Sequence, residues 1–331
     1  MRYIDNPNTD PALNMALEEY LMTAPKFAAM EEPLVMLYFS APSVLVGRHQ
    51  NTFEEVDLDY AEAHKLPVVR RRSGGGAIYE DLGTLIFAFI TPYRRDNVRN
   101  FRRFTAPVVA TLQALGLPAE LSGRNDILID GRKVSGSAQY TDGKRMVTHG
   151  TLLFDTDLEA LTQALRVKTD KIASKGLKSI RSRVTNIREH LSRDMSVSEF
   201  RQALLRGLFP DDPLPELTLT AEAWAGAEAI AARRYRQWSW NFGHSPKFNV
   251  QLRERLPLGE IDVRLEVRKG LITEAKIYGD FFGEREIAEL ETLLRGQRYR
   301  RSDLAAALEG VDLTAYFGDI TVERFLDLLV P

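Results

Sequence analysis

The chain has no cysteine among its 331 residues. That absence excludes disulfides, thiolate metal ligands and a cysteine nucleophile. An excess of charge of one sign is also missing, because 44 lysines and arginines are balanced by 46 aspartates and glutamates, for a formal net charge of -2. This near-neutral balance argues against a general nucleic-acid binder and against a membrane-surface binder.

Long apolar runs are absent as well. No run approaches the ~18 residues that a membrane-spanning helix needs, and the N-terminus lacks the charged and then apolar pattern of a signal peptide. The expected location is therefore the cytoplasm, without a membrane partner. A length of 331 residues allows a substantial core and predicts more than one domain.

A basic, glycine-rich stretch occupies residues 70–79. Three arginines lead through Ser73 into Gly74, Gly75 and Gly76. Glycine lets a ligand approach the backbone closely, and bare N–H groups beside positive charge suit a polyanion. Apolar segments at 66–69 and 84–90 predict strands on both sides, so the loop joins strand to strand. A P-loop would need a following lysine and a helix, which are missing. The alternative is a glycine-rich hairpin that binds nothing.

A second group of polar residues lies in a predicted antiparallel meander. Turn signals at 130–131 and 142–143 separate three extended segments between residues 126 and 154. With a two-residue first turn, Leu128 lies opposite Lys133, and Asp126 lies opposite Ser135. Asp126 and Lys133 are then diagonal neighbours on one face. Alternation places Ser135 and Ser137 on that face as well, and the other face receives Val134, Gly136 and Ala138.

A lysine beside a carboxylate and hydroxyls suits the activation of a phosphate group. The alternative is an exposed hairpin on which Lys133 and Asp126 form a surface ion pair worth about 0–1 kcal/mol. His149, on the third segment, is either a residue that lines a pocket or a satisfied core histidine. The basic run from Lys168 to Arg183 is either a solvated face or, in its part at 179–186, a segment near the site.

Together these segments resemble the signatures of lipoate–protein ligases. The matching segments lie at 10–19, 70–83, 123–138, 149–153 and 175–186, and the similarity continues more loosely toward the C-terminus. Contiguous glycines at 74–76 favour lipoate over biotin, whose ligases share the fold but interleave glycine with arginine. Related transferases that move octanoyl or lipoyl groups from carrier to carrier pass through a cysteine thioester, which this chain cannot form.

The resemblance implies an ATP-dependent, AMP-forming reaction. Lipoate is activated as lipoyl-AMP and then transferred to a lysine of an apo lipoyl domain, in the E2 subunits of 2-oxoacid dehydrogenases or in the glycine cleavage H protein. Lys133 is the expected catalytic residue, and Asp126 the expected Mg²⁺ ligand. The expected ATP contacts are Arg71, Gly75, Gly76, Ala77, Ile78, Tyr79 and Lys133. The expected lipoate contacts are Lys133, Gly75, His149 and Ser135.

The predicted fold class is α+β, with mixed or antiparallel sheets flanked by helices as in the biotin and lipoate ligases. Helical spacing follows Asp10-Pro11, and a second amphipathic helix runs from Phe101 to a stop at Gly116. Beyond residue 243, alternation at 261–268 predicts a one-face-buried strand. The expected domains are a catalytic domain at 1–245 and a small α+β accessory domain at 246–331.

Two other functions stay open at this point. A carrier-to-carrier transferase would form no AMP, and a non-catalytic relative would bind lipoyl domains or lipoyl-AMP without turnover. A nucleic-acid-binding module is disfavoured, because no aromatic residues interleave with the basic run at 168–183.

Overall fold

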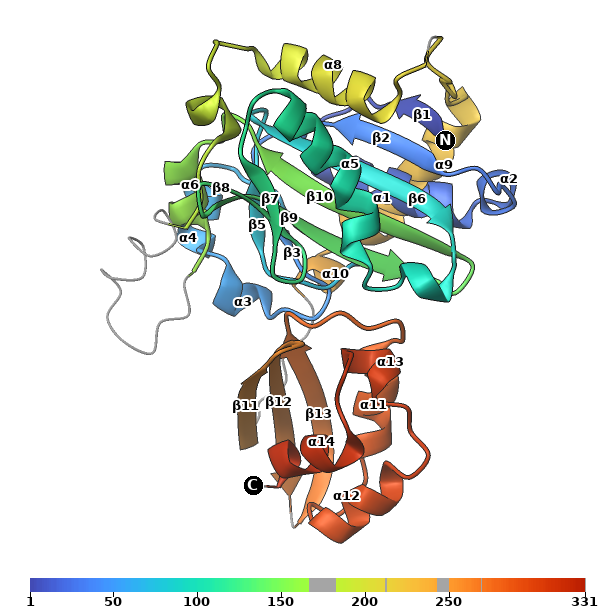
Figure 1. The fold of residues 1–331 in the computed structure, drawn as a ribbon. Helices are drawn as coiled ribbons and strands as arrows, with labels where there is room; N and C mark the ends of the chain where they lie inside the picture. The colour runs from blue at the N-terminus through green and yellow to red at the C-terminus, as the bar shows by residue number, and fades with distance from the viewer. Residues whose placement is uncertain (167–182, 212, 243–249, 269, 331) are drawn as a thin grey trace. The chain divides into compact units, whose positions relative to one another are not determined.

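The computed structural model describes residues 1–166, 183–211, 213–242, 250–268 and 270–330 (Figure 1). Contacts divide the chain into two compact units. The first comprises residues 1–46, 52–71 and 77–241, and the second comprises 47–51, 72–76 and the C-terminal part from Phe242. The predicted boundary at 245/246 falls within 243–249, outside the described residues. Within the described ranges, no helix has the length and apolar character needed to cross a membrane.

A seven-stranded mixed sheet forms the centre of the first unit, in the order β1-β2-β6-β10-β9-β8-β7. The pairing of β1 with β2 is parallel, and the other pairings are antiparallel. The predicted meander is confirmed and includes one further strand, β7. The bounds are β1 (Arg2–Asp5), β2 (Leu34–Tyr38), β6 (Thr84–Pro92), β7 (Ala119–Ser122), β8 (Asp126–Ile129), β9 (Arg132–Thr141) and β10 (Arg145–Leu153).

Helices cover both faces of this sheet (Figure 1). Helices α5 (Phe101–Ala114) and α8 (Val197–Leu208) pack on one face, and α1 (Pro11–Thr23) and α9 (Ala221–Ile230) pack on the other. The sequence of β6 is continuously apolar because its alternate side chains enter the cores on opposite faces of the sheet, and both faces are buried.

Both helices that residue spacing predicted are present, and a capping residue marks one end of each. Asp10 caps α1, since its carboxylate accepts hydrogen bonds from the N–H groups of Ala12 and Leu13. Helix α5 ends before Gly116, whose φ of 84° suits the left-handed position after a helix. Shorter helices are α2 (Pro25–Ala28), α3 (Thr52–Glu55), α4 (Leu58–Ala63), η1 (Arg95–Asn97), α6 (Leu158–Ala164), η2 (Ile187–His190), η3 (Ala231–Tyr235) and α10 (Trp238–Asn241).

A small three-stranded sheet carries the glycine-rich loop. Its order is β4-β3-β5, with β3 (Ser43–Val46) between β4 (Val68–Arg70) and β5 (Ile78–Glu80). Strand β3 pairs in parallel with β4 and antiparallel with β5. The segment at 71–77 therefore passes from one side of β3 to the other.

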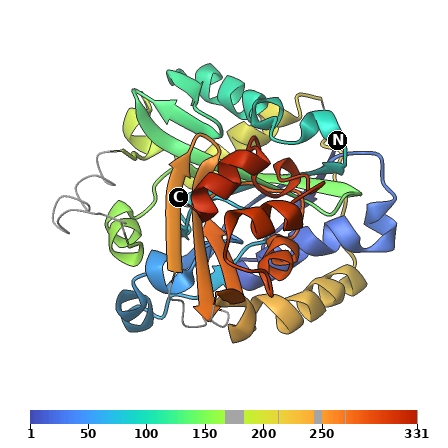
Figure 2. The ribbon, with the colours of Figure 1, turned by 90° about the horizontal axis from the view of Figure 1, so that it is seen from below.

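The C-terminal part of the second unit is a three-stranded antiparallel sheet with helices on one face (Figure 2). The predicted strand at 261–268 lies within β12, and its buried residues Ile261, Val263 and Leu265 enter the core of this unit. Strand β11 had no sequence prediction. The bounds are β11 (Val250–Leu256), β12 (Gly259–Arg268), β13 (Leu271–Gly279), α11 (Ile287–Leu294), α12 (Arg301–Ala307), α13 (Thr314–Phe317) and α14 (Val322–Leu329). The predicted α+β class is confirmed.

Candidate functional site

The glycine-rich loop joins two strands, as predicted, but it is not a hairpin. Strands β4 and β5 both pair with β3 and not with each other. The loop therefore does not need its glycines to close a tight two-strand turn. The sheet topology removes the hairpin alternative that the sequence left open.

The local structure requires glycine for different reasons at positions 74 and 75, and gives no such reason at position 76. A Cβ on Gly74 would lie 2.2 Å from the carbonyl oxygen of Phe281, so Gly74 is required by packing within the second unit. Gly75 has a φ of 89°, a conformation that favours glycine. Among the described residues, no atom lies within 4 Å of the Cβ position of Gly76, and its φ is not in the left-handed region. Of the three glycines, Gly76 is thus the one at which neither the described protein atoms nor the backbone conformation require a residue without a side chain.

Arg71 is buried, with 4% of its surface exposed. Its N–H group donates to the carbonyl of Val46, and its Nη1 donates to the carbonyl of Leu45 at 3.3 Å. Burial lowers the pKa of the Arg71 guanidinium to about 10, against the attraction of Glu80. The side chain therefore stays charged at neutral pH, inside the first unit.

Strand β5 can contact a ligand through its backbone rather than through its side chains. Tyr79 packs into a core cluster with Val44 and Val46, and burial raises the pKa of its phenol. Because β5 is an edge strand of the β4-β3-β5 sheet, one row of its N–H and C=O groups is not used in pairing with β3. Residues 77–79 can accordingly meet a ligand through the backbone.

The turn before Lys133 is formed as predicted. Asp130 and Gly131 have φ values of 49° and 73°, the pattern of a two-residue hairpin turn. Leu128 lies opposite Lys133. This part of the register follows from local turn chemistry alone.

Beyond this turn the predicted register is wrong. A bulge between Ile127 and Leu128 places Ile127 opposite Ser135, and Asp126 opposite Gly136. One extra residue on β9 exchanges the faces of all residues that follow it. Ser135 consequently faces the core that contains Ile127, and it is 1% exposed.

Gly136 takes the position expected for a serine. A Cβ on Gly136 would lie 2.9 Å from Nζ of Lys133 and 3.7 Å from Oδ1 of Asp126. The predictions that Ser135 and Ser137 share the face of Lys133, and that Gly136 and Ala138 do not, are therefore both wrong. Small residues adjoin the ammonium instead of hydroxyls.

Lys133 and Asp126 form the predicted pair, with 2.8 Å between Nζ and Oδ1. About a third of each side chain is exposed, so this ion pair adds at most about 1 kcal/mol to stability. The backbone of Lys133 donates to the carbonyl of Arg183 and accepts from the N–H of Thr185. The described end of the basic segment thus adjoins Lys133, as expected, while its part at 168–182 lies outside the described residues.

His149 has a partner that sequence reasoning missed. Its Nδ1 lies 2.7 Å from Oε2 of Glu18 on α1, and both side chains are buried. The hydroxyl of Tyr38 donates to Oε1 of the same carboxylate at 2.9 Å. One signal was available, because Asn14 and Glu18 are polar residues one turn apart on a helix that is otherwise largely apolar.

Lys133 and His149 lie on the same face of the seven-stranded sheet. Gly136 faces the lysine, Ala138 is two residues further along β9 and shares its face, and Ala138 lies opposite His149. On β9, Gly136 and Ala138 therefore lie between the ammonium and the imidazole.

Glu80, the last residue of β5, is also buried and was not singled out from the sequence. Burial raises the pKa of Glu80 to about 7, while a hydrogen bond with Ser40 and the charges of His149 and Arg71 limit the rise. The negative charge of Glu18 adds to it. Glu80 thus belongs to the same buried polar group as Arg71 and His149.

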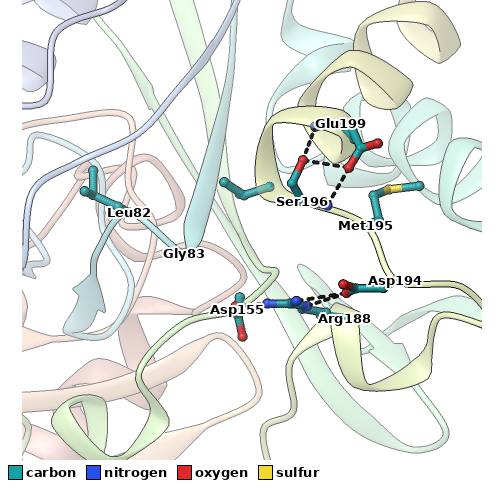
Figure 3. Close-up of a pocket in the computed structure, with 9 residues that line it drawn as sticks. Leu82, Gly83, Asp155, Arg188, Asp194, Met195, Ser196 and Glu199 are labelled. Atoms are coloured by element: carbon teal, nitrogen blue, oxygen red, sulfur yellow. Dashed lines mark hydrogen bonds and ion pairs between the residues drawn. The ribbon is translucent and has the colours of Figure 1, made fainter.

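A separate cavity of about 470 Å³ lies beside the N-terminus of α8 (Figure 3). Arg188 spans part of its wall and contacts Asp155 at 2.6 Å and Asp194 at 2.8 Å. None of the predicted site residues lines this cavity, so it does not support their roles. Its lining residues are Leu82, Gly83, Asp155, Arg188, Asp194, Met195, Ser196, Val197 and Glu199.

Within the first unit, the Lys133–Asp126 pair and the buried His149 thus share one face of the sheet, with Gly136 and Ala138 on β9 between them. In known proteins, two family models match this chain: the lipoyl protein ligase A/B catalytic domain over residues 10–209 and the bacterial lipoate protein ligase C-terminus over residues 245–329. The chain therefore belongs to the lipoate–protein ligase family.

Individual relatives agree with the family models. The lipoate-protein ligase LplJ of Bacillus subtilis is 50% identical, covering 99% of this chain and all of that protein. The crystal structure of P. falciparum LipL1 in complex with lipoate has the same fold, with a TM-score of 0.80 at 21% identity over 98% of this chain and 97% of that one. A lipoate-protein ligase A bound with ATP has a TM-score of 0.62 at 29% identity, over 73% of this chain and 98% of that one.

Proposed function

We propose that this protein activates lipoate with ATP and transfers the lipoyl group to a lysine of an acceptor protein. The observation that carries the proposal is the common face of Lys133 and His149, with Gly136 and Ala138 between them. It offers an ammonium for a carboxylate at one end and a closely packed floor for an aliphatic chain. Membership of the lipoate–protein ligase family supports this assignment.

In the first half-reaction, a carboxylate oxygen of lipoate attacks the α-phosphorus of ATP. The bond from that phosphorus to the bridging oxygen breaks, and pyrophosphate leaves. We assign to the Lys133 ammonium the contact with both the carboxylate and the α-phosphate. It aligns the two reactants and stabilises the charge that develops on the phosphoryl oxygens.

In the second half-reaction, a neutral acceptor lysine attacks the carbonyl carbon of lipoyl-AMP. The bond from this carbon to the phosphate oxygen breaks, AMP leaves, and the new amide loses a proton to solvent. Activation as an adenylate supplies the leaving group, so no covalent enzyme intermediate is needed. This suits a chain without cysteine, and it disfavours the carrier-to-carrier transferase.

The ATP contacts that we propose are Arg71, Lys133 and the backbone at 75–79. Gly76 supports this assignment, because no protein atom among the described residues explains its missing side chain. The edge position of β5 leaves, in the segment Ala77–Tyr79, the N–H and C=O groups that are not bonded to β3 for hydrogen bonds to the nucleotide. Arg71 supplies positive charge from a buried position.

A magnesium ion normally accompanies ATP in such reactions and neutralises charge on its phosphates. Among the described residues there is no cluster of three or more carboxylates, histidines or cysteines that forms a metal cage. Asp126 alone fits a site in which one carboxylate and the oxygens of the nucleotide share the ion. We therefore propose Asp126 as the single protein ligand.

For lipoate we propose contacts with Lys133, at the carboxylate, with His149, further along the face, and with Gly75. Ser135 was expected in this set, but its position opposite Ile127 gives that role no support. We propose lipoyl domains of E2 subunits and the H protein as the acceptors, as the family resemblance implies.

The test is incubation of the protein with lipoate, MgATP and a purified apo lipoyl domain, with acceptor mass and AMP release measured together. A lipoyl mass shift that requires ATP and yields AMP is the expected result. Acceptor modification without AMP would favour the carrier-to-carrier transferase. Binding of the lipoyl domain with neither product would favour the non-catalytic alternative.

A further inference from the structure

Arg70 is the last residue of β4 and directly precedes Arg71, one of the proposed ATP contacts. Only 8% of Arg70 is exposed. Strand β4 lies at the edge of the β4-β3-β5 sheet, so one row of its backbone N–H and C=O groups needs partners outside the sheet. The groups that bind this edge therefore also set where the chain enters the glycine-rich loop.

Side chains of α10 bind that edge at Arg70. The N–H group of Arg70 donates to Oδ1 of Asn241 at 2.9 Å, and the carbonyl of Arg70 accepts from Nε1 of Trp240 at 2.8 Å. These partners lie 171 and 170 residues further along the chain. Helix α10 thus takes the place of a neighbouring strand at this point of β4.

The guanidinium of Arg70 bonds to the same helix. Its Nε donates to the carbonyl of Trp240 at 3.0 Å. Its Nη2 donates to the carbonyl of Asn241 at 3.0 Å and to Oγ1 of Thr52 at 2.7 Å. The hydroxyl of Thr52 in turn donates to the carbonyl of Asn241 at 2.6 Å. Asn241 therefore binds Arg70 through both its side chain and its main chain.

Asn241 is itself fixed within the first unit. It is buried, and its Nδ2 donates to the carbonyl of Tyr235 at 2.7 Å. The hydroxyl of Tyr235 donates to Oε2 of Glu19 on α1 at 2.8 Å. All these residues belong to the first unit. A series of buried contacts thus leads from α1, which packs on the seven-stranded sheet, to the residue that precedes Arg71.

We propose that Asn241 is a positioning residue for ATP: by holding Arg70 through its amide oxygen and its carbonyl, it sets the place of Arg71. The inference rests on the proposed function, in which Arg71 contacts the nucleotide. Asn241 does not contact the substrates in this scheme, but acts through Arg70. Because Arg70 is already held at its N–H, its carbonyl and its guanidinium, little ordering of this segment remains to be done when the nucleotide binds.

The experiment measures lipoate-dependent pyrophosphate release by the parent, Asn241→Leu and Asn241→Asp, with KM determined for ATP and for lipoate. Leucine is similar in size but forms neither side-chain hydrogen bond. We expect it to raise KM for ATP by about 10–100-fold, the usual worth of a hydrogen bond to a charged group. KM for lipoate should change less, because Lys133 and His149 lie on the seven-stranded sheet.

Asn241→Asp keeps an oxygen that accepts from the N–H of Arg70, but it loses the donor to Tyr235. It should therefore recover part of the affinity for ATP. A leucine variant and an aspartate variant with equally raised KM for ATP would contradict the role assigned to the amide oxygen.

Trp240→Phe tests the same segment without disturbing the buried amide, and it decides the question even if Asn241→Leu does not fold. It removes the donor to the carbonyl of Arg70 but keeps an aromatic ring at a half-buried position. We expect KM for ATP to rise by about 2–10-fold. Trp238→Phe is the matched control, because Trp238 lies on the same helix but is 61% exposed. Its KM values should equal those of the parent.

A second control is Asn6→Leu. Asn6 is also a buried asparagine, and its amide accepts from the N–H of Asn8 and donates to Asn14. Its variant should lower the melting temperature and leave both KM values unchanged. If Asn241→Leu and Trp240→Phe likewise keep the parental KM for ATP, Asn241 has only a structural role and the inference is overturned. A parent that releases no pyrophosphate would instead overturn the proposed function, and this inference with it.

Discussion

Lys133 is held from several directions in this structure. Its ammonium pairs with Asp126, its backbone bonds to Arg183 and Thr185, and β8 pairs along the other edge of β9. A group that is already oriented needs little reorganisation when charge develops beside it. This preorganisation is the physical basis of the role proposed for Lys133.

Replacing Lys133 with alanine should lower the rate of lipoyl-AMP formation by about 10²–10³-fold, the usual cost of one preorganised donor. Lys144→Ala is the matched control, because Lys144 is an exposed lysine at the opposite turn of β9. Quenched-flow measurement of the adenylate reports the rate directly. Parental rates in the Lys133 variant would remove this residue from the mechanism.

Gly136 offers a test of the bulge. An added methyl group at Gly136 would come within 2.9 Å of the lysine ammonium, which can move because it ends a flexible side chain. Gly136→Ala should therefore leave the melting temperature nearly unchanged and lower adenylation by about tenfold or more, which corresponds to 1.4 kcal/mol. The rate falls because the added methyl group displaces the Lys133 ammonium.

Ser135→Ala is the paired variant, since Ser135 faces the opposite core. We expect its KM for lipoate and its rate to match the parent. A large increase in KM would mean that the hydroxyl reaches the ligand, and that the face deduced from the strand register is incorrect.

A substitution at Gly76 tests contact with a ligand without introducing backbone strain. Gly76→Ala meets no protein atom among the described residues, so its stability should equal that of the parent. If the nucleotide approaches the backbone here, its affinity should fall by about tenfold or more. Calorimetric titration with ATP measures this loss. Gly75→Val would be less informative, because a φ of 89° makes the variant strained even without ligand.

At the scale of elements, two close contacts set how helices meet in the first unit. Gly207 on α8 packs against Thr111 on α5, and Gly226 on α9 packs against Tyr20 on α1. In both cases the glycine allows the neighbouring side chain to approach the helix backbone. These contacts support the two faces of the sheet that carries Lys133 and His149.

Gly207→Ala should lower the free energy of unfolding by about 1–3 kcal/mol. The new Cβ would lie 2.0 Å from Oγ1 of Thr111, and this threonine is held because its hydroxyl donates to the carbonyl of Pro107. Urea unfolding gives the change, and adenylation per folded molecule should be unaffected. In the double variant with Thr111→Ala, the cost should be smaller than the sum of the two single costs; additive costs would mean that the two residues do not clash.

At the scale of the whole molecule, Glu80 links stability to pH. Its pKa in the folded state is about 7, above the usual 4.5. The folded state therefore binds more protons than the unfolded state between these values, and stability falls as pH rises through this window. The loss that this carboxyl contributes is at most about 3 kcal/mol, since one pKa unit corresponds to 1.36 kcal/mol.

The measurement is urea unfolding of the parent and of Glu80→Gln at about pH 5 and about pH 8. The difference between the two pH values should be smaller in the variant, because glutamine does not titrate. An equal difference in both proteins would show that Glu80 does not titrate in this window. Glu19→Gln is the control, because Glu19 is another buried carboxylate and bonds to Arg234 and Tyr235.

Features that depend on neighbouring residues could be predicted from the sequence. The Asp10 cap of α1, the Asp130-Gly131 turn and the pairing of Leu128 with Lys133 follow from short-range chemistry. The order of the motifs was sufficient to indicate the ligase family, and the absence of cysteine needed no structure at all.

Which side chains meet depends on long-range packing and could not be predicted from the sequence. A bulge of one residue moved Gly136 to the face of Lys133 and Ser135 away from it, because strand register depends on how both cores are filled. Glu18 reaches His149 across 131 residues of sequence, since α1 covers that face of the sheet. Likewise, burial by surrounding elements sets the charge behaviour of Arg71 and Glu80, which the residue types alone do not specify.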